Sequence, residues 1–203
     1  MININLGSGP FSADGWINFD FGLLPLFGKF RLTKILVFLK LIDKSYNVKW
    51  PKFRYFDIRH HLPFTSDSVD NIYCSNVLEH FDKFEVIKIL SECRRLLGRK
   101  GLLRVVLPDL KKIIENYSNS DNFCREFYGF DKDLNIGFIT KIKSKFIRGH
   151  QWMYDVESFV KLLNDCGFER INIVSFKKGR CPNIDVLDLP VHERLCFYVE
   201  ATA

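Results

Sequence analysis

The first 20 residues, MININLGSGPFSADGWINFD, constrain the fold more than any other stretch. Apolar residues alternate over 2–6, which predicts a buried strand that runs into Gly7, Ser8 and Gly9, and a second strand ends at Asp20. Glycines let the backbone turn tightly and approach a ligand, while a carboxylate at the tip of the next strand can accept both hydroxyls of a ribose. The stretch therefore favours a nucleotide pocket, although an ordinary turn explains Gly-x-Gly taken alone.

Two later strands end in polar residues that belong at the same edge of a sheet. Residues 53–56 alternate as a third strand ending at Asp57, and a fourth strand over 69–74 is followed by Ser75 and Asn76. In a doubly wound sheet, ligands bind beyond the carboxyl ends of the strands. Four strand ends therefore converge on one predicted pocket, which favours a binding site over an ordinary glycine turn.

Two helices show clear start and stop signals. The first is predicted to begin after Asp82, with Glu85 reaching back in a capping box, and to stop at Gly98. The second is predicted to begin after Asp155 and to stop at Gly167. Apolar residues repeat at helical spacing in both, so both helices are expected to contribute to the core.

The second half of the chain supplies the remaining strands. A strand over 101–110 ends at Asp109, which either faces the pocket or caps a helix over 110–117. Two final strands are predicted over 171–178 and 194–201, with no clear helix between them. These two strands are therefore expected to pair antiparallel, which gives an otherwise parallel sheet one reversed strand.

Residues 118–149 show no regular pattern. Aromatic residues are nevertheless frequent in this segment, at Phe123, Phe127, Tyr128, Phe130, Phe138 and Phe146. Long irregular stretches inside compact domains are usually lids or binding loops. The segment is therefore the best candidate for substrate recognition.

The formal charge of +6 is concentrated in residues 21–54. That stretch holds eight Lys or Arg residues against Asp43 alone, a net charge of +7, so the rest of the chain carries −1. A helix is predicted from about Thr33 to Asp43. A membrane-spanning helix is rejected, because Lys34 and Lys40 would each cost about 2.5–3.5 kcal/mol near the centre of a bilayer.

Two interpretations of residues 21–54 remain open. One is a helix that covers a face of the sheet and keeps its lysines in water. The other is a basic amphipathic segment that lies on an anionic membrane. A general nucleic-acid binder is not favoured, because such proteins more often spread their charge over several elements.

Length and cysteine usage indicate a single cytoplasmic domain. The 203 residues suit one core, and the six cysteines form no C-x-x-C pair and no cluster with histidine. Neither a metal site nor a disulfide framework is expected, and reduced thiols are typical of the cytosol. The chain enters a strand at once, without the charged and apolar regions of a signal peptide.

Several motifs resemble those of class I S-adenosylmethionine-dependent methyltransferases, specifically the small bacterial, methyltransferase type 11-like branch often encountered among cell-surface polysaccharide genes. The motifs are NLGSGP at 5–10, GWINFD at 15–20, FDIRHHLPF at 56–64, SVDNIYCSNVLEHF at 68–81, RVVLPDL at 104–110, RGHQWMYD at 148–155 and LLNDCGF at 162–168. The resemblance implies an α/β, Rossmann-like, doubly wound sheet of seven strands in the order 3-2-1-4-5-7-6, with the last strand antiparallel. It implies one domain over 1–203, with an insertion at about 21–52 and a substrate-side segment at about 110–154.

The resemblance assigns eight residues at strand ends to S-adenosylmethionine. The glycine turn would pass under the methionine part, and acidic side chains would hold the ribose and flank the adenine. The residues are Gly7, Ser8 and Gly9 for the methionine part, Asp20 for the ribose hydroxyls, Asp57 and Ile58 for the adenine, and Ser75 and Asn76 for the floor near the sulfonium.

The general base has three candidates in the sequence. A general base helps methyl transfer to hydroxyls, and His150, Asp109 and His80 are the candidates beside the predicted pocket mouth, with His150 the first choice. Structural roles compete with this one. His150 can instead tie a loop to the final helix, His80 can be a packed, hydrogen-bonded histidine, and Glu79 can be a cap or part of a surface ion pair.

One departure from the family pattern concerns the first connection. Only ten residues lie between Gly9 and Asp20, too few for the full helix that usually follows the glycine turn. We expect a single helical turn there, with weaker support of the cofactor by a helix dipole. Because no separate cap precedes the first strand, the substrate must be covered by residues 21–54, by residues 118–149 or by another subunit.

The resemblance favours O-methylation of a sugar or of a glycan or lipid-linked intermediate, with residues 21–54 contacting an anionic membrane at its inner face. A protein that binds the cofactor without catalysis is one alternative, and an RNA methyltransferase is a second, although nucleic acid is not the expected partner. A nicotinamide enzyme is disfavoured because Ser12 replaces the third glycine and Asp20 comes too early. Methylation of a base amino group is disfavoured because CSNV follows the fourth strand.

Overall fold

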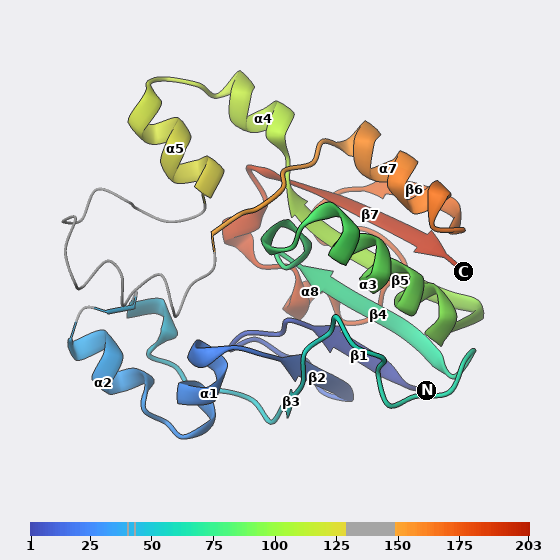
Figure 1. Ribbon diagram of the computed structural model, residues 1–203, viewed down its shortest axis with the longest axis horizontal. Coiled ribbons are helices and arrows are strands. Elements are labelled where there is room, and N and C mark those ends of the chain that lie inside the picture. The colour runs from blue at the N-terminus through green and yellow to red at the C-terminus, as the bar shows by residue number, and fades with distance from the viewer. Residues whose placement is uncertain (40, 43, 129–148) are drawn as a thin grey trace.

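The computed structural model describes residues 1–39, 41–42, 44–128 and 149–203 (Figure 1). Lys40, Asp43 and residues 129–148 lie outside the described residues. The predicted recognition segment 118–149 is therefore described only at its ends. Its residues Phe130, Phe138 and Phe146 lie outside the described residues.

Seven strands form one mixed sheet in the order β3-β2-β1-β4-β5-β7-β6. The pairs from β3 to β5 are parallel, and β7 runs antiparallel to both of its neighbours. The predicted order and the single reversed strand are both confirmed. The strands are β1 (Asn3–Leu6), β2 (Trp16–Asp20), β3 (Arg54–Tyr55), β4 (Val69–Ser75), β5 (Leu97–Pro108), β6 (Glu169–Val174) and β7 (Cys196–Thr202).

Helices α3 and α7 cover one face of the sheet (Figure 1). On this face Ile4 of β1, Leu90 of α3 and Phe159 of α7 belong to one buried cluster. The α-helices are α1 (Leu23–Lys29), α2 (Thr33–Phe38), α3 (Lys83–Leu96), α4 (Leu110–Glu115), α5 (Ser120–Tyr128), α7 (Val156–Asp165) and α8 (Ile184–Leu187). Short 3-10 helices span Lys44–Tyr46, Leu78–His80 and Pro190–His192. Within the described part of the chain, no helix has the length and apolar character needed to cross a bilayer.

The predicted start of α3 is confirmed, and its predicted stop is wrong. The Asp82 carboxylate accepts a hydrogen bond from the Glu85 N–H at 2.9 Å, and the Glu85 carboxylate accepts one from the Asp82 N–H at 3.2 Å. The helix ends at Leu96, because Leu97 is already extended, and Gly98 belongs to β5. A Cβ at Gly98 would lie 3.2 Å from the Asp67 carbonyl, so the glycine allows close packing of two chain segments.

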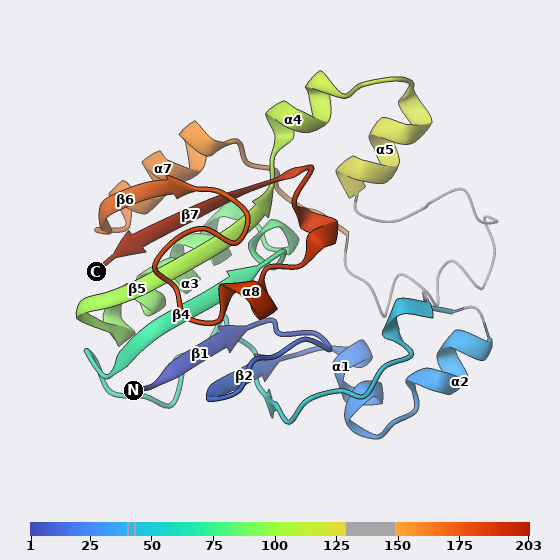
Figure 2. The same cartoon turned by 180° about the vertical axis from the view of Figure 1, so that it is seen from behind.

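The opposite face of the sheet is covered by the connection between β6 and β7, which includes α8 (Figure 2). Leu187 in this connection packs in a buried cluster with Trp16 of β2 and Tyr73 of β4. The Trp16 indole donates to Asn183 Oδ1 at 3.0 Å, and the Tyr73 hydroxyl donates to the Leu187 carbonyl at 2.9 Å. The predicted helical turn between β1 and β2 is absent from the described residues 7–15, so this distant segment takes the place of a helix.

Residues 21–54 do not cover a face of the sheet, contrary to one of the two interpretations. They form α1, α2 and a 3-10 turn around a separate apolar cluster of Leu24, Leu36, Ile42 and Trp50, at the carboxyl end of the first strands (Figure 1). Close packing holds this unit together, since a Cβ at Gly28 would lie 2.2 Å from the Trp50 ring. The predicted helix 33–43 is shorter, and α2 ends at Phe38.

Three other boundaries differ from the predictions. β3 contains only Arg54–Tyr55, and β6 ends at Val174 because the chain turns where the Lys178 N–H donates to the Ser175 carbonyl at 3.0 Å. Helix α5 occupies part of the segment that showed no regular pattern. Its Phe123 and Phe127 rings, one helical turn apart, stack with centroids 5.7 Å apart.

Candidate functional site

A pocket of about 830 Å³ lies beyond the carboxyl ends of β1, β2 and β4. This volume lies within the range of roughly 300–1,000 Å³ that is typical of small-molecule sites. All eight residues predicted to bind the cofactor line it: Gly7, Ser8, Gly9, Asp20, Asp57, Ile58, Ser75 and Asn76. The structure thus brings together four strand ends that are up to 70 residues apart in the sequence.

The glycine turn folds back onto β2. The Gly7 and Ser8 N–H groups donate to the Phe19 carbonyl at 2.9 and 3.2 Å. Gly7 and Gly9 have φ values of 65° and 54°, in the left-handed region that glycine adopts without strain. A Cβ at Gly7 would lie 2.3 Å from a Val77 methyl, so only glycine fits between β1 and the wall of the pocket.

Asp20, at the end of β2, is a half-buried acid of the pocket. One carboxylate oxygen accepts from the Gly9 N–H at 2.6 Å, and the other accepts from the Phe21 N–H at 2.8 Å. Burial nevertheless raises the pKa of Asp20 to about 6, because desolvation outweighs both hydrogen bonds. Each oxygen retains a further lone pair that can accept from a ligand hydroxyl.

Asp57 is held by an arginine that the motifs did not single out. Arg59 donates through Nε to both Asp57 oxygens, at 2.9 and 3.0 Å, and through one terminal nitrogen to Glu85 at 2.9 Å. The side-chain hydrogen bonds from Arg59 hold the pKa of Asp57 below its usual value. Asp57 therefore stays charged and fixed beside Ile58, whose side chain is buried.

Ser75 and Asn76 form the floor at the end of β4. Asn76 has a φ of 52°, and its N–H donates to the Val106 carbonyl at 2.9 Å. The Asn76 amide donates to Ser75 Oγ at 3.2 Å, and His192 Nδ1 lies 3.5 Å from the same Ser75 oxygen. His192, from the β6–β7 connection, is a pocket residue that sequence reasoning missed, and burial lowers its pKa.

The three proposed base candidates occupy different places. His80 lines the pocket. The His150 side chain is 8% exposed, and its ring centroid lies 5.2 Å from that of His80. Asp109 caps α4, where its carboxylate accepts from the Lys111 N–H at 3.1 Å, so the capping role left open by the sequence is observed. Among the described residues, neither His150 nor Asp109 belongs to the pocket lining.

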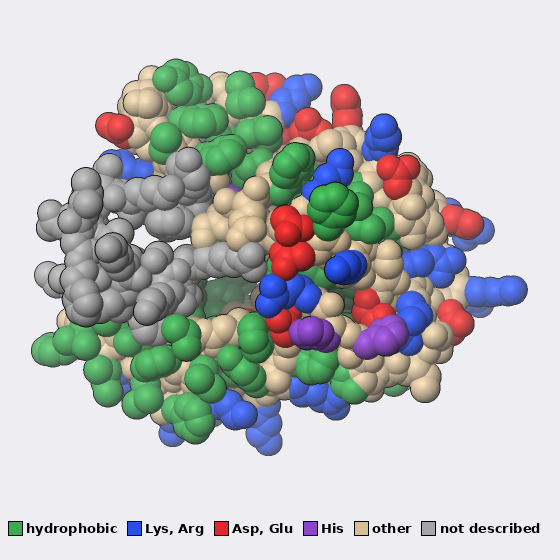
Figure 3. Space-filling view, viewed as in Figure 1, with side chains coloured by type: hydrophobic (Ala, Val, Ile, Leu, Met, Phe, Trp, Pro, Cys, Tyr) green, Lys and Arg blue, Asp and Glu red, His purple; other side chains and the backbone are tan. Residues whose placement is uncertain are grey.

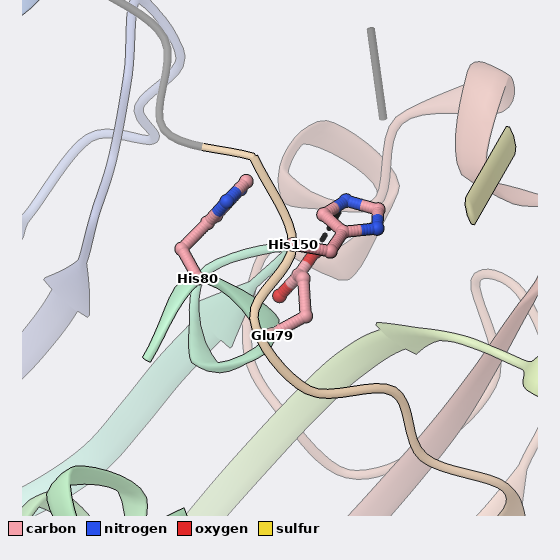
Figure 4. A group of neighbouring side chains, drawn as sticks. All are labelled: Glu79, His80 and His150. Atoms are coloured by element: carbon pink, nitrogen blue, oxygen red, sulfur yellow. Dashed lines mark ion pairs between the residues drawn. The ribbon is translucent and has the colours of Figure 1, made fainter. Parts of the chain in front are cut away.

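Glu79 lies between the two histidines (Figure 4). Its side chain is 1% exposed, so it is neither part of a surface ion pair nor a solvent-exposed cap. One Glu79 oxygen lies 4.0 Å from His150 Nε2. Burial raises the pKa of Glu79 to about 8 and lowers that of His150.

The insertion contributes a large part of the pocket wall, which the sequence indicated only as a need for a cover. Its described lining residues are Phe21, Gly22, Leu23, Leu24, Pro25, Tyr46 and Trp50. The aromatic and apolar character of residues 21–54 was the only sequence signal for this wall. The position of these residues beside the cofactor residues could not be predicted, because it depends on how α1 and α2 pack around Trp50.

The sheet order and the strand-end pocket define the class I, Rossmann-like methyltransferase fold. A model of the methyltransferase domain family (type 11) matches residues 37–105, which is about one third of the chain. The match includes β3, β4 and α3 with Asp57, Ile58, Ser75 and Asn76. The glycine turn and Asp20 lie outside it.

Similar proteins agree with this fold. The chain is 37% identical over 76 residues to the uncharacterized protein MJ0638 of Methanocaldococcus jannaschii, an alignment that covers 37% of this chain and 30% of that protein. A SAM-dependent methyltransferase from Archaeoglobus fulgidus superposes with a TM-score of 0.53 at 14% identity, covering 99% of this chain and 85% of the other. The carbon methyltransferase CurJ gives 0.52 at 14% identity, covering 100% of this chain and 48% of the other. These structural similarities show the fold.

Proposed function

We propose that this protein is an S-adenosylmethionine-dependent methyltransferase that methylates a hydroxyl group of a sugar or glycan intermediate carried on a membrane lipid. The observation that carries the proposal is Asp20, a half-buried carboxylate held against the glycine turn inside a pocket of about 830 Å³. The methyltransferase model that matches residues 37–105 implies S-adenosylmethionine as the cofactor.

The residues of the pocket fit this cofactor. Open space lies where a Cβ at Gly9 would be, so a ligand can approach the backbone there, and Asp20 can accept from ribose hydroxyls. Asp57, Ile58 and Ser75 line the same pocket. Asp57 and Ile58 would flank the adenine, and Ser75 would lie near the sulfonium. When bound, S-adenosylmethionine supplies a methyl group from its positively charged sulfur. The rest of the cofactor is the leaving group, a neutral thioether.

The chain's own residues position the acceptor and exclude water from it. Positioning alone can supply roughly 7–11 kcal/mol of a displacement barrier, and a general base adds about 10²–10⁴-fold. His80 lines the pocket and can take the proton of an acceptor hydroxyl, with His150 behind it. Phe21 and Trp50 form an apolar wall on the insertion side.

The insertion supports a lipid-linked acceptor, because it carries an exposed apolar surface with cations along its lower border in Figure 3. Phe30, Ile35 and Phe38 are 63%, 54% and 84% exposed, although apolar side chains of this size are usually buried. The exposed cations on the same two helices and the turn that joins them are Lys29, Arg31 and Lys34. An anionic membrane surface matches both properties, and the same insertion lines the pocket.

Vesicle flotation tests this docking surface. The protein is expected to float with vesicles that contain an anionic lipid and to float less with purely zwitterionic vesicles. Changing Lys29, Arg31 and Lys34 together to Gln is expected to weaken binding by up to about 100-fold, at about 1 kcal/mol per cation. The matched control changes the exposed Lys88, Lys100 and Lys161, outside the insertion, to Gln. Equal binding of both variants and of both vesicle types would refute the membrane role.

Calorimetry tests the cofactor. S-adenosylmethionine is expected to bind at one site per chain, and Asp20→Ala is expected to weaken binding about 10- to 100-fold, because a charged hydrogen bond is worth about 1.5–3 kcal/mol. Asp14→Ala, an exposed acid in the same connection, is the control and should bind like the wild type. Absence of binding at millimolar cofactor would defeat the enzymatic function.

A methyl-transfer screen tests the acceptor. Sugar, lipid-linked and RNA acceptors are offered with labelled cofactor, and transfer to a saccharide hydroxyl is the expected result. Transfer to RNA would replace the proposed acceptor. Cofactor binding with no transfer to any acceptor would instead favour a non-catalytic partner protein.

A further inference from the structure

We propose that Glu79, His80 and His150 bind a divalent transition-metal ion at the acceptor side of the pocket (Figure 4). One carboxylate oxygen and one nitrogen from each ring lie within 4.8 Å of one another. Spacing in the sequence gave no expectation of a metal, because His150 comes 70 residues after His80. The fold brings the two histidines together.

The first observation is the state of the Glu79 carboxylate. Its side chain is 1% exposed, and neither oxygen has a hydrogen-bond partner within the described part of the chain. A buried carboxylate without donors is costly, and buried charges are normally paired or coordinate metals. A cation between these residues would supply the partner that the two Glu79 oxygens lack.

The second observation is the orientation of His150. Its Nδ1 lies 2.6 Å from the Phe127 carbonyl, which can only accept, so Nδ1 carries the proton. The neutral ring then presents the lone pair of Nε2, 4.0 Å from Glu79 Oε1. Metal-binding histidines are usually fixed in this way by a carbonyl or carboxylate on the other nitrogen.

The third observation is that the backbone fixes the two chain segments together. The Gln151 and Trp152 N–H groups donate to the Glu79 carbonyl at 2.7 and 3.2 Å. These bonds hold the backbone that follows His150 against Glu79. Ligand atoms around a tetrahedral ion with bonds of 2.0–2.1 Å lie about 3.3 Å apart, so separations of up to 4.8 Å have to shorten by up to about 1.5 Å.

The donor set indicates the class of ion. Two imidazoles and one carboxylate suit zinc, manganese or iron, whereas magnesium prefers oxygen ligands. Catalytic zinc sites have three protein ligands and leave another position for water or substrate. His80 lines the pocket, so an acceptor hydroxyl oxygen can take that position.

The role of the ion in activating the acceptor rests on the proposed methyltransferase function. In this arrangement His80 would hold the ion instead of taking the acceptor proton itself. The ion would lower the pKa of a coordinated hydroxyl, whose proton would pass to solvent, so the acceptor would become a better nucleophile without a dedicated base. The acceptor would be an alcohol or a pair of neighbouring hydroxyls rather than an amine. Binding of the metal itself does not require transferase activity, so the two proposals can fail separately.

Metal titration of the full chain, without cofactor, is the test. After chelator treatment, Co²⁺ followed by visible absorption is expected to bind at one equivalent, and Zn²⁺ to displace it. Glu79→Gln and His150→Ala are each expected to weaken binding more than about tenfold. His61→Ala is the matched control, because His61 also pairs with a carboxylate, Glu92 at 2.7 Å, but is 75% exposed. Calorimetry with S-adenosylmethionine on the same samples reports the cofactor site separately.

Three results would overturn the proposal. They are no Co²⁺ or Zn²⁺ binding at millimolar metal, unchanged affinity in both variants, and tighter binding of Mg²⁺ than of Zn²⁺. If the variants fail to fold, X-ray absorption at the zinc edge of the wild-type chain decides. Two imidazole nitrogens in the coordination shell support the proposal, and fewer than two refute it.

Discussion

At the scale of single residues, the ionisation of Asp20 should control cofactor affinity. Burial raises its pKa to about 6, and ribose hydroxyls bind best to the charged form. Below pH 6 the free carboxyl is mostly protonated, so affinity for S-adenosylmethionine is expected to fall as pH falls, about tenfold between pH 7 and pH 5. Calorimetry across this range measures the effect.

Asp20→Asn is the control for this pH dependence. The amide cannot ionise, so the variant is expected to bind weakly and with nearly the same affinity at pH 5 and pH 7. A wild-type affinity that stays constant across this range would contradict the assignment of Asp20 to the ribose.

A second residue-scale prediction concerns Arg104 of β5, which is fully buried. Its guanidinium donates to Asp188 Oδ1 at 3.1 Å and to Glu200 Oε1 at 2.9 Å, and both acids are buried. Arg104→Leu would leave two buried carboxylates without their cation and is expected to lower the free energy of unfolding by about 3–5 kcal/mol. Arg99→Leu, an exposed position on the same strand, is expected to change it by less than about 0.5 kcal/mol. Denaturant unfolding compares the two.

At the scale of elements, the insertion should be a separable unit. Gly28→Val would drive a side chain into the Trp50 ring, because the Cβ alone would come within 2.2 Å. The variant is expected to expose amides of α1 and α2 to hydrogen exchange while β4 and β5 stay protected. Ile35→Ala, an exposed change on α2, should leave protection unchanged. Loss of protection in β4 as well would show that the insertion is part of the main core.

Elements with regular periodicity were predictable from the sequence, and those that depend on packing were not. The capping box at Asp82 is a local signal that predicted the start of α3. The glycine turn after β1 and the polar residues that end β2 and β4 are also local signals, and they predicted residues of the pocket. The positions of His192 and Trp50 depend on tertiary contacts from connections that have no period of their own. The Glu79–His150 cluster was missed for the same reason, since 70 residues separate its members.

At the scale of the whole molecule, the cofactor should stabilise the fold, because the pocket joins the strands, the insertion and the β6–β7 connection. At 100 times its dissociation constant, a ligand that binds only the folded chain adds about 2.7 kcal/mol. For a chain of this size that corresponds to a rise in Tm of roughly 5–10 °C. Differential scanning calorimetry measures the shift, and no shift at saturating cofactor would contradict a site formed by the folded chain.

The cover that the β6–β7 connection provides has a consequence for the order of folding. Trp16 and its hydrogen-bond partner Asn183 are separated by 167 residues, so one face of the first two strands can be closed only when the last part of the chain is present. Such long-range contacts form slowly, because a large loop must close first. A ribosome adds roughly 5–20 residues per second, so the glycine turn leaves the ribosome many seconds before its cover. The nascent chain therefore carries the cofactor motif long before it has a finished site, and ligand binding is among the last properties that the protein acquires.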